Sequence, residues 1–316
     1  MGSNASSQTK RAGGHHRFGE TWRLNEKAPL AGCIVFLHGL GDTGQNSASS
    51  LETVHLHNVR FVCPTAPTQP LSLHDGELVT AWFDLFDSPP SARMTDSENL
   101  WTKIDWNGVN ESVNHVKRLI ESEVAKGVPS EKLFVGGFSQ GGTIALRAAM
   151  RCERKLGGVI MLSSFVGPAD DLQPGKIPTA NAKIPVFWGH GDKDPKVPIK
   201  LGMLGAESLK ELGIPVEWKT YRGMGHNTCK AEFIDFKAFV EKVLDSTVSS
   251  PFTPSSSEVE TMSKTACSSR LLARGKAYVG RFEKSEVVGI VSIMAAISVA
   301  MLAAMLAAIF LRISGV

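Results

Sequence analysis

Hydrophobic residues recur along the middle of the chain in two alternating patterns. Short apolar runs bounded by Gly or Pro predict buried parallel strands at residues 33–37, 59–63, 133–135, 159–162, 186–188 and 216–221. Between them, apolar positions at helical spacing predict helices at residues 109–124, 141–150, 199–212 and 233–244. Strands that alternate with helices predict an α/β fold with a doubly wound, mostly parallel sheet.

The two ends of the chain differ from this middle part. Residues 1–27 are polar and rich in Gly and Ser, which predicts a disordered segment, whereas residues 28–246 form the predicted α/β domain. Residues 247–285 open with the sequence STVSSPFTPSSSE, which is typical of a flexible linker. Residues 286–312 are the predicted transmembrane segment.

This transmembrane prediction rests on length and on the absence of charge. Residues 287–311 form an uncharged stretch of about 25 residues, above the roughly 20 that a helix needs to cross a bilayer. A buried core helix rarely runs so long without a polar face, and a glycosylphosphatidylinositol signal would need a signal peptide, which residues 1–27 do not resemble. More basic residues precede the segment than follow it. The sequence therefore predicts a single-pass membrane protein with its large domain in the cytosol.

Composition narrows the choice of partners. The chain of 316 residues has a net charge of +3 and no nucleic-acid-binding motif, so we expect no nucleic-acid partner. Five cysteines, an odd number, do not indicate a disulfide framework and favour a reducing compartment. The first six residues, MGSNAS, fit the pattern for N-myristoylation and make Gly2 a candidate lipidation site. The oligomeric state stays open.

A candidate nucleophile lies between a predicted strand and a predicted helix. Gly137-Phe138-Ser139-Gln140-Gly141 matches the pattern G-x-S-x-G, and strand, sharp turn and helix are the context that a nucleophile elbow requires. The glycines are needed because the turn holds the serine in a strained backbone conformation with no room for neighbouring side chains. We therefore predict Ser139 as the nucleophile.

A serine hydroxyl is a poor nucleophile until a base takes its proton. His226 follows the last predicted strand and precedes the last predicted helix. A hydrolase whose catalytic residues come in the chain order serine, acid, histidine carries its base at this place. The acid that orients the histidine should follow an earlier strand, where Asp192 and Asp194 both lie. Spacing alone does not separate these two aspartates.

The oxyanion of the reaction intermediate needs two backbone amide donors. One is the amide of Gln140, directly after the nucleophile. The other should come from the glycine-rich loop at residues 38–42, where Leu40 is our choice. The same loop is also a plain turn, and the two roles are compatible.

Several motifs taken together resemble one family, the acyl-protein thioesterases and their carboxylesterase and lysophospholipase relatives. The matching pieces are FLHGLGDTG (36–44), CPTAP (63–67), WFD (82–84), GGFSQGG (136–142), HGDKDPKVP (190–198) and GMGH (223–226). In that family the residue before the proline of the GDxDP motif is the acid, so the resemblance selects Asp194. It also implies that Leu40 and Gln140 supply the oxyanion amides, and we expect Phe165 and Trp82 to line the acyl site.

The resemblance implies an α/β-hydrolase fold and a serine hydrolase that needs no metal and no organic cofactor. Its expected reaction is removal of fatty acyl groups from S-acylated (palmitoylated) proteins by thioester hydrolysis through an acyl-enzyme, with the membrane as a second partner through the C-terminal helix. The alternative is a lysophospholipase or general carboxylesterase that uses the same triad. A catalytically silent receptor or scaffold of the same fold is disfavoured, because the triad and both oxyanion loops are intact.

Overall fold

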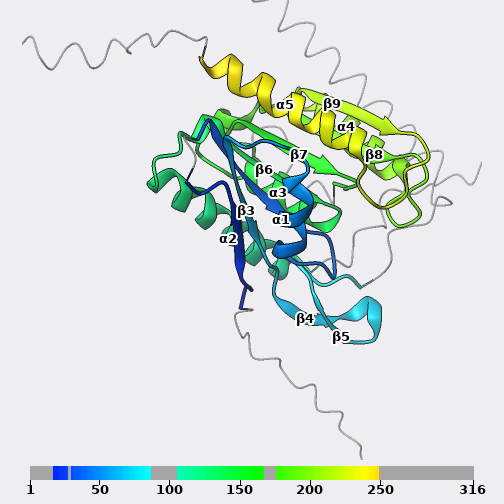
Figure 1. The fold of residues 1–316 in the computed structure, drawn as a ribbon. Coiled ribbons are helices and arrows are strands. Elements are labelled where there is room, and N and C mark those ends of the chain that lie inside the picture. Colours follow the sequence, from blue (N-terminus) through cyan, green and yellow to red (C-terminus); the bar gives the residue numbers. More distant parts are fainter. Residues whose placement is uncertain (1–16, 28–29, 87–104, 167–175, 249–316) are drawn as a thin grey trace, which may run out of the picture. The chain divides into compact units, whose positions relative to one another are not determined.

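A seven-stranded sheet with helices on both faces makes up the core of the protein (Figure 1). The computed structural model describes residues 17–27, 30–86, 105–166 and 176–248. The strand order is β1-β3-β2-β6-β7-β8-β9, and every pair of neighbouring strands is parallel except β1 and β3. The doubly wound, mostly parallel sheet expected from the sequence is therefore confirmed.

Except for β1, the strands of this sheet begin where the apolar runs begin, or one residue before. They are β1 (Thr21–Leu24), β2 (Gly32–Leu37), β3 (Val59–Pro64), β6 (Leu133–Phe138), β7 (Gly158–Leu162), β8 (Val186–Gly191) and β9 (Val216–Tyr221). A separate hairpin, β4 (Thr68–Leu71) and β5 (Glu77–Thr80), projects from the body of the protein (Figure 1). Strand β9 is mostly half-buried because it forms an edge of the sheet, whereas the sequence pattern predicts burial on both faces.

Five helices cover the sheet within the described residues. They are α1 (Gly44–Glu52), α2 (Trp106–Ala125), α3 (Gln140–Met150), α4 (Ile199–Glu211) and α5 (Lys230–Val248). Side chains of α2, α3 and α4 pack into one hydrophobic core with Cys33 and Val35 of β2, and those of α1 and α5 pack into a second with Ile34 and Phe36. Successive residues of a strand point to opposite faces, so this double core requires strands that are apolar throughout.

Strand β1 lies within the segment that the sequence predicts to be disordered. It pairs antiparallel with β3, and the Asn25 side chain that follows it donates hydrogen bonds to the carbonyls of Leu56 (3.0 Å) and Val59 (2.8 Å). The sequence signal for β1 is weak because the strand has four residues, is mostly half-exposed and includes a charged residue, Arg23. The structured part of the chain therefore starts before residue 28.

The transmembrane part of the predicted fold class is corrected. Within the residues that the structure describes, none of the helices has the length and apolar character needed to cross a bilayer. The longest, α2 and α5, bury one face and carry charged residues on the other, as amphipathic helices on a sheet do. The segment 286–312, the linker after residue 248 and Gly2 lie outside the described residues. The fold class that the described residues show is α/β, and the predicted single-pass membrane localisation is not supported.

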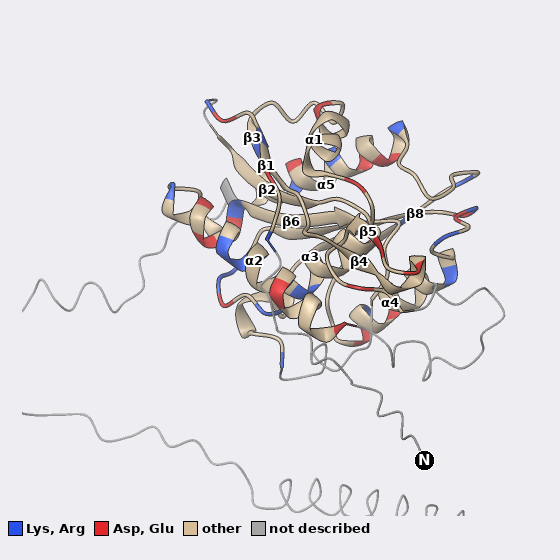
Figure 2. Cartoon of the chain, turned by 90° about the horizontal axis from the view of Figure 1, so that it is seen from below, with Lys and Arg blue, Asp and Glu red and all other residues tan. Residues whose placement is uncertain are grey.

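Charged residues of both signs are distributed over the helices and loops that surround the sheet (Figure 2). Glu123 of α2 is a buried acidic side chain that accepts hydrogen bonds from Arg60 of β3 and from Lys126, each at 2.7 Å. Burial acts to raise the pKa of Glu123, but these two cations outweigh it and hold the pKa below its usual range. These charged contacts therefore tie α2 to the sheet.

The direction of winding changes between β2 and β6. From β2 the chain passes through α1 to β3 on one side, whereas β6 pairs with β2 on the other side. In open α/β sheets, ligands bind beyond the carboxyl ends of the strands at such a point. The loop at residues 38–42 follows β2 and Ser139 follows β6, so two of the predicted functional segments meet there.

Candidate active site

Ser139 lies on the turn between β6 and α3, with φ 51° and ψ −122°. This left-handed backbone is unfavourable for a residue with a side chain, by about 1–3 kcal/mol, and persists only where neighbours enforce it. The Ser139 amide donates to the carbonyl of Leu162 at 2.9 Å, and Ser164 Oγ donates to the Ser139 carbonyl at 2.7 Å. Strand β7 and the residues after it therefore hold the turn in its strained form.

The glycines on each side of Ser139 are required by close backbone approach. A Cβ atom added to Gly141 would lie 2.3 Å from the carbonyl oxygen of Leu37, and one added to Gly137 would lie 2.5 Å from the carbonyl carbon of Gly141. Real Cβ atoms do not come this close to backbone. The start of α3 can pack against the ends of β2 and β6 only because both residues are glycine.

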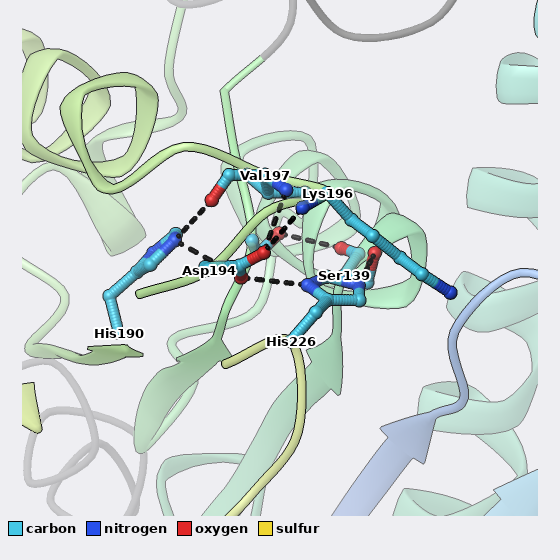
Figure 3. A network of polar contacts seen from close by, with 7 residues as sticks. Ser139, His190, Asp194, Lys196, Val197 and His226 are labelled. Atoms are coloured by element: carbon cyan, nitrogen blue, oxygen red, sulfur yellow. Dashed lines mark hydrogen bonds and ion pairs between the residues drawn. The ribbon is translucent and has the colours of Figure 1, made fainter. Parts of the chain in front are cut away.

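The three predicted catalytic side chains meet at the carboxyl edge of the sheet (Figure 3). His226 Nε2 lies 3.0 Å from Ser139 Oγ, and His226 Nδ1 lies 2.7 Å from Asp194 Oδ2. A carboxylate only accepts, so Nδ1 donates to Asp194 and Nε2 is left to accept from the serine hydroxyl. Asp192 takes another role, since its Oδ1 accepts from the amide of Gly223 at 2.6 Å. Of the two aspartates left open by spacing, the structure brings Asp194 to the histidine.

The Asp194 carboxylate is fixed by several hydrogen bonds. Besides His226, the amides of Lys196 and Val197 each donate to its Oδ1 at 2.9 Å. Burial acts to raise the pKa of Asp194, but the hydrogen bonds from His226 and from the two amides outweigh it, so the pKa lies below its usual value. Asp194 is therefore ionised at neutral pH and can stabilise an imidazolium at His226.

A second histidine, His190, supports the same aspartate. Its side chain is fully buried, its Nε2 donates to the carbonyl of Val197 at 2.9 Å, and the same nitrogen lies 3.5 Å from Asp194 Oδ2. In Figure 3 Asp194 lies between His190 and His226. Burial lowers the pKa of His190 and keeps it neutral. No role is predicted for His190 from the sequence, although its position four residues before Asp194 in the HGDKD motif is an available signal.

Gln140 is held in place by its own side chain. Its Oε1 accepts from the Trp82 amide at 2.8 Å, and its Nε2 donates to the Phe83 carbonyl at 2.8 Å. Gln140 is also the first residue of α3, a position whose amide has no acceptor inside the helix. Its backbone N–H is therefore available beside Ser139 for an oxyanion.

The loop at residues 38–42, which carries Leu40, is fixed by contacts to the end of the hairpin and to the segment after it. Gly41 donates its amide to the carbonyl of Thr80 at 2.8 Å, and the indole Nε1 of Trp82 donates to the carbonyl of His38 at 2.8 Å. The loop that follows β2 thus presents backbone amides next to Ser139. Preorganised amides of this kind are the requirement for stabilising an oxyanion.

A cavity of about 530 Å³ opens at Ser139 and His226, within the range typical of small-molecule sites. Its lining includes Leu40, Gln140 and Phe165, three residues expected there from the sequence, together with apolar side chains from the hairpin and the segment after it: Leu73, Val79 and Leu85. The structure places Trp82 elsewhere: it is 1 % exposed and belongs to the hydrophobic core. A large aromatic ring whose N–H finds an acceptor inside the protein packs well in the core, so Trp82 supports the site instead of lining the cavity.

Fold and site together define an α/β hydrolase in which hydrogen bonds link a serine to a histidine and the histidine to an aspartate. Residues 24–244 match the family described as Phospholipase/Carboxylesterase, and the chain belongs to that family. This confirms the family resemblance seen in the sequence motifs. In the part of the chain that the structure describes, His, Cys, Asp and Glu side chains form no group that could hold a metal ion.

Named relatives agree with this assignment. The chain is 38% identical over 216 residues to acyl-protein thioesterase 1 of Gibberella zeae, covering 67% of this chain and 90% of the relative. It is 34% identical over 227 residues to acyl-protein thioesterase 1 of Saccharomyces cerevisiae, covering 69% and 95%. The crystal structure of Zea mays acyl-protein thioesterase 2 superposes with a TM-score of 0.61 at 31% identity, covering 72% and 99%. The chain is thus a hydrolase of the thioesterase and carboxylesterase class, as its motifs predict.

Proposed function

We propose that this enzyme removes fatty acyl groups from S-acylated proteins by hydrolysing the thioester through an acyl-enzyme intermediate. The observation that carries the proposal is the continuous hydrogen-bond path from Ser139 Oγ through His226 to Asp194, at 3.0 and 2.7 Å. The thioesterase names of the relatives support the choice of substrate.

The chemistry starts at the serine hydroxyl. Ser139 Oγ attacks the carbonyl carbon of the thioester while His226 Nε2 takes the hydroxyl proton, and Asp194 stabilises the resulting imidazolium. The amides of Leu40 and Gln140 donate to the oxyanion of the tetrahedral intermediate. When this intermediate collapses, the C–S bond breaks, the cysteine thiolate departs with the proton from His226, and the acyl group stays on Ser139.

The second half of the reaction uses the same groups. A water molecule gives its proton to His226 and attacks the acyl carbonyl, and collapse of the new tetrahedral intermediate releases the fatty acid and restores the Ser139 hydroxyl. The cavity of about 530 Å³ supports a fatty acyl substrate, because Leu73, Val79, Leu85 and Phe165 give it apolar walls. No step in this scheme requires a metal ion or an organic cofactor.

Oxyester hydrolysis is the second candidate, and the family description Phospholipase/Carboxylesterase favours it. The same nucleophile, base and oxyanion donors would cleave a lysophospholipid or a simple carboxylic ester. The two candidates differ in the leaving group alone. A substrate profile that compares thioesters with oxyesters of the same acyl chain therefore separates them.

The deciding experiment measures release of thiol from a palmitoyl-cysteine peptide by the full chain and by its Ser139→Ala variant. We expect the variant to lose at least about a thousandfold in kcat, because nucleophile and base act as one unit. An unchanged melting temperature of the variant would show that it is folded. Cleavage of lysophospholipid but not of the peptide would favour the second candidate, and equal activity of both proteins would exclude Ser139 as the nucleophile.

A further inference from the structure

A second cavity adjoins the catalytic cavity at His226. It has a volume of about 220 Å³, and Asp42, Phe138 and His226 line both cavities. A third cavity of about 500 Å³ adjoins the second, since Thr228 and Phe233 line both. Helix α1 and the start of α5, which cover the same face of the sheet, form much of the walls (Figure 1). We call these two cavities the α1–α5 groove.

The groove meets the catalytic site on the side of the base. His226 lines it, whereas Ser139, Leu40 and Gln140 line the catalytic cavity alone. In acyl transfer the oxyanion lies beside the amide donors, and the leaving atom lies beside the histidine that protonates it. A substrate with its acyl chain in the catalytic cavity therefore directs its leaving group past His226 and toward the α1–α5 groove.

The far end of the groove combines apolar surface with positive charge. Phe233 is half-buried there, and Ile234 is 58% exposed, which is high for a large aliphatic side chain. Lys230 is exposed, and no acidic side chain of the described residues forms an ion pair with it. Lys237 donates to the carbonyl of His55 at 3.1 Å and lies 3.8 Å from Glu241. These features fit an extended peptide that carries both apolar and acidic side chains.

We propose that the α1–α5 groove binds the polypeptide that flanks the acylated cysteine and that Lys230 and Lys237 select acidic residues in it. This assignment rests on the proposed thioesterase function, since it names the leaving-group half of that substrate. The acidic residues lie a few positions away from the cysteine, because Asp42 lines the catalytic end of the groove and the lysines line the far end. The ion pairs are solvent-exposed, so their effect weakens as salt concentration rises.

The test compares two thioesters that share an octanoyl group. One has N-acetylcysteamine as its leaving group, and the other has a cysteine peptide with Asp and Glu on both sides. The measured quantity is kcat/KM for the peptide divided by kcat/KM for the small thioester. In the full chain with Lys230→Glu and Lys237→Glu we expect this ratio to fall about tenfold at low salt, since two attractions become repulsions. A peptide with Lys in place of Asp and Glu should show the opposite change.

Two matched controls separate binding from folding. Lys155→Glu makes the same charge change at an exposed position just before β7, at the amino ends of the parallel strands and so away from the catalytic site, and should leave the ratio unchanged. Ile234→Ser should lower the ratio for both peptides, whereas Leu204→Ser, which removes an aliphatic side chain that is 52% exposed on α4, should not. A purely structural effect of a groove variant would lower both activities together and leave the ratio constant.

The outcomes distinguish the two proposals. If the unaltered enzyme cleaves both thioesters and no groove variant changes the ratio, the groove assignment is wrong and the proposed function stands. If the unaltered enzyme cleaves neither thioester, the proposed function fails and the groove assignment falls with it. A ratio that falls with Lys230→Glu and Lys237→Glu and rises for the basic peptide supports both.

Discussion

At the scale of single residues, two aspartates only two positions apart receive different hydrogen bonds. Asp194 is 7% exposed and accepts from His226 and from two backbone amides, whereas Asp192 accepts from the amide of Gly223 at the surface. A buried carboxylate that faces an imidazole sets its tautomer and stabilises its charged form. The carboxylate of Asp192 instead closes the turn that leads to His226.

We expect Asp194→Asn to lower kcat by about ten-thousandfold, because an amide can donate to Nδ1 and so favours the wrong tautomer of His226. Asp192→Asn is the matched control, since the amide oxygen of Asn can still accept from Gly223; we expect it to change kcat by less than about tenfold. Steady-state hydrolysis of one thioester by both variants measures the difference. Equal losses in the two variants would mean that the turn, and not the contact with His226, limits activity.

Sequence reasoning reached those site residues whose roles follow from chain order. Ser139 and His226 could be found because a strand, a turn and a helix mark each position. Spacing could not choose between the aspartates, because that choice depends on which carboxylate turns inward, and the family motif was needed to select Asp194. Trp82 was misplaced for a similar reason: its indole binds the carbonyl of His38, a contact between residues distant in the chain.

At the scale of helices and strands, the contact between α5 and β8 contains a buried acidic residue, Glu232. The carboxyl group of Glu232 is fully buried, neither of its oxygens has a hydrogen-bond partner among the described residues, and a Cβ added to Gly189 of β8 would lie 2.3 Å from its Oε1. Burial raises the pKa of Glu232 to about 8 from the ordinary 4.5. The folded protein therefore holds Glu232 in its neutral form at pH 7.

This burial makes stability depend on pH. Between pH 4.5 and pH 8 the unfolded chain has released the Glu232 proton and the folded protein has kept it, so the unfolded state binds fewer protons and the free energy of unfolding falls as pH rises. The fall amounts to at most about 5 kcal/mol over that range, at 1.36 kcal/mol per pKa unit. Glu232→Gln stays neutral at every pH and removes the dependence.

Urea unfolding at pH 5, 6, 7 and 8 tests this expectation. The free energy of unfolding of Glu232→Gln relative to the parent should rise steadily across the series. Glu241→Gln, on an exposed position of the same helix, removes the same charge without burial and should show no such trend. Parallel curves for the parent and Glu232→Gln would mean that Glu232 is hydrated and ionised in the folded protein.

Elements were predictable where an apolar pattern was long enough to be unambiguous. The inner strands and four of the helices follow such patterns, because each buries apolar side chains at a regular period. Helix α1 has the sequence GQNSASSLE, with Ala48 and Leu51 as its buried aliphatic residues, so its pattern is too sparse to recognise. The β4–β5 hairpin contains a proline within β4 and exposed residues, which argue against a strand in isolation.

At the scale of the whole molecule, the sheet begins at β1, and the position of this edge strand gives the last prediction. Without residues 17–27, β3 would become an edge strand with unpaired backbone groups beside buried side chains such as Phe61 and Val62. The two hydrogen bonds from Asn25 to the segment before β3 and to its first residue would also be lost.

We therefore expect deletion of residues 1–27 from the full chain to lower the melting temperature by on the order of 10 °C relative to deletion of residues 1–16. The shorter deletion is the matched control, because it keeps every described residue of β1. Thermal unfolding followed by circular dichroism gives the two temperatures, and gel filtration at rising concentration shows whether the new edge promotes association. Equal melting temperatures would mean that β1 adds nothing to the sheet and that the domain starts at residue 28, as the hydrophobic pattern predicts.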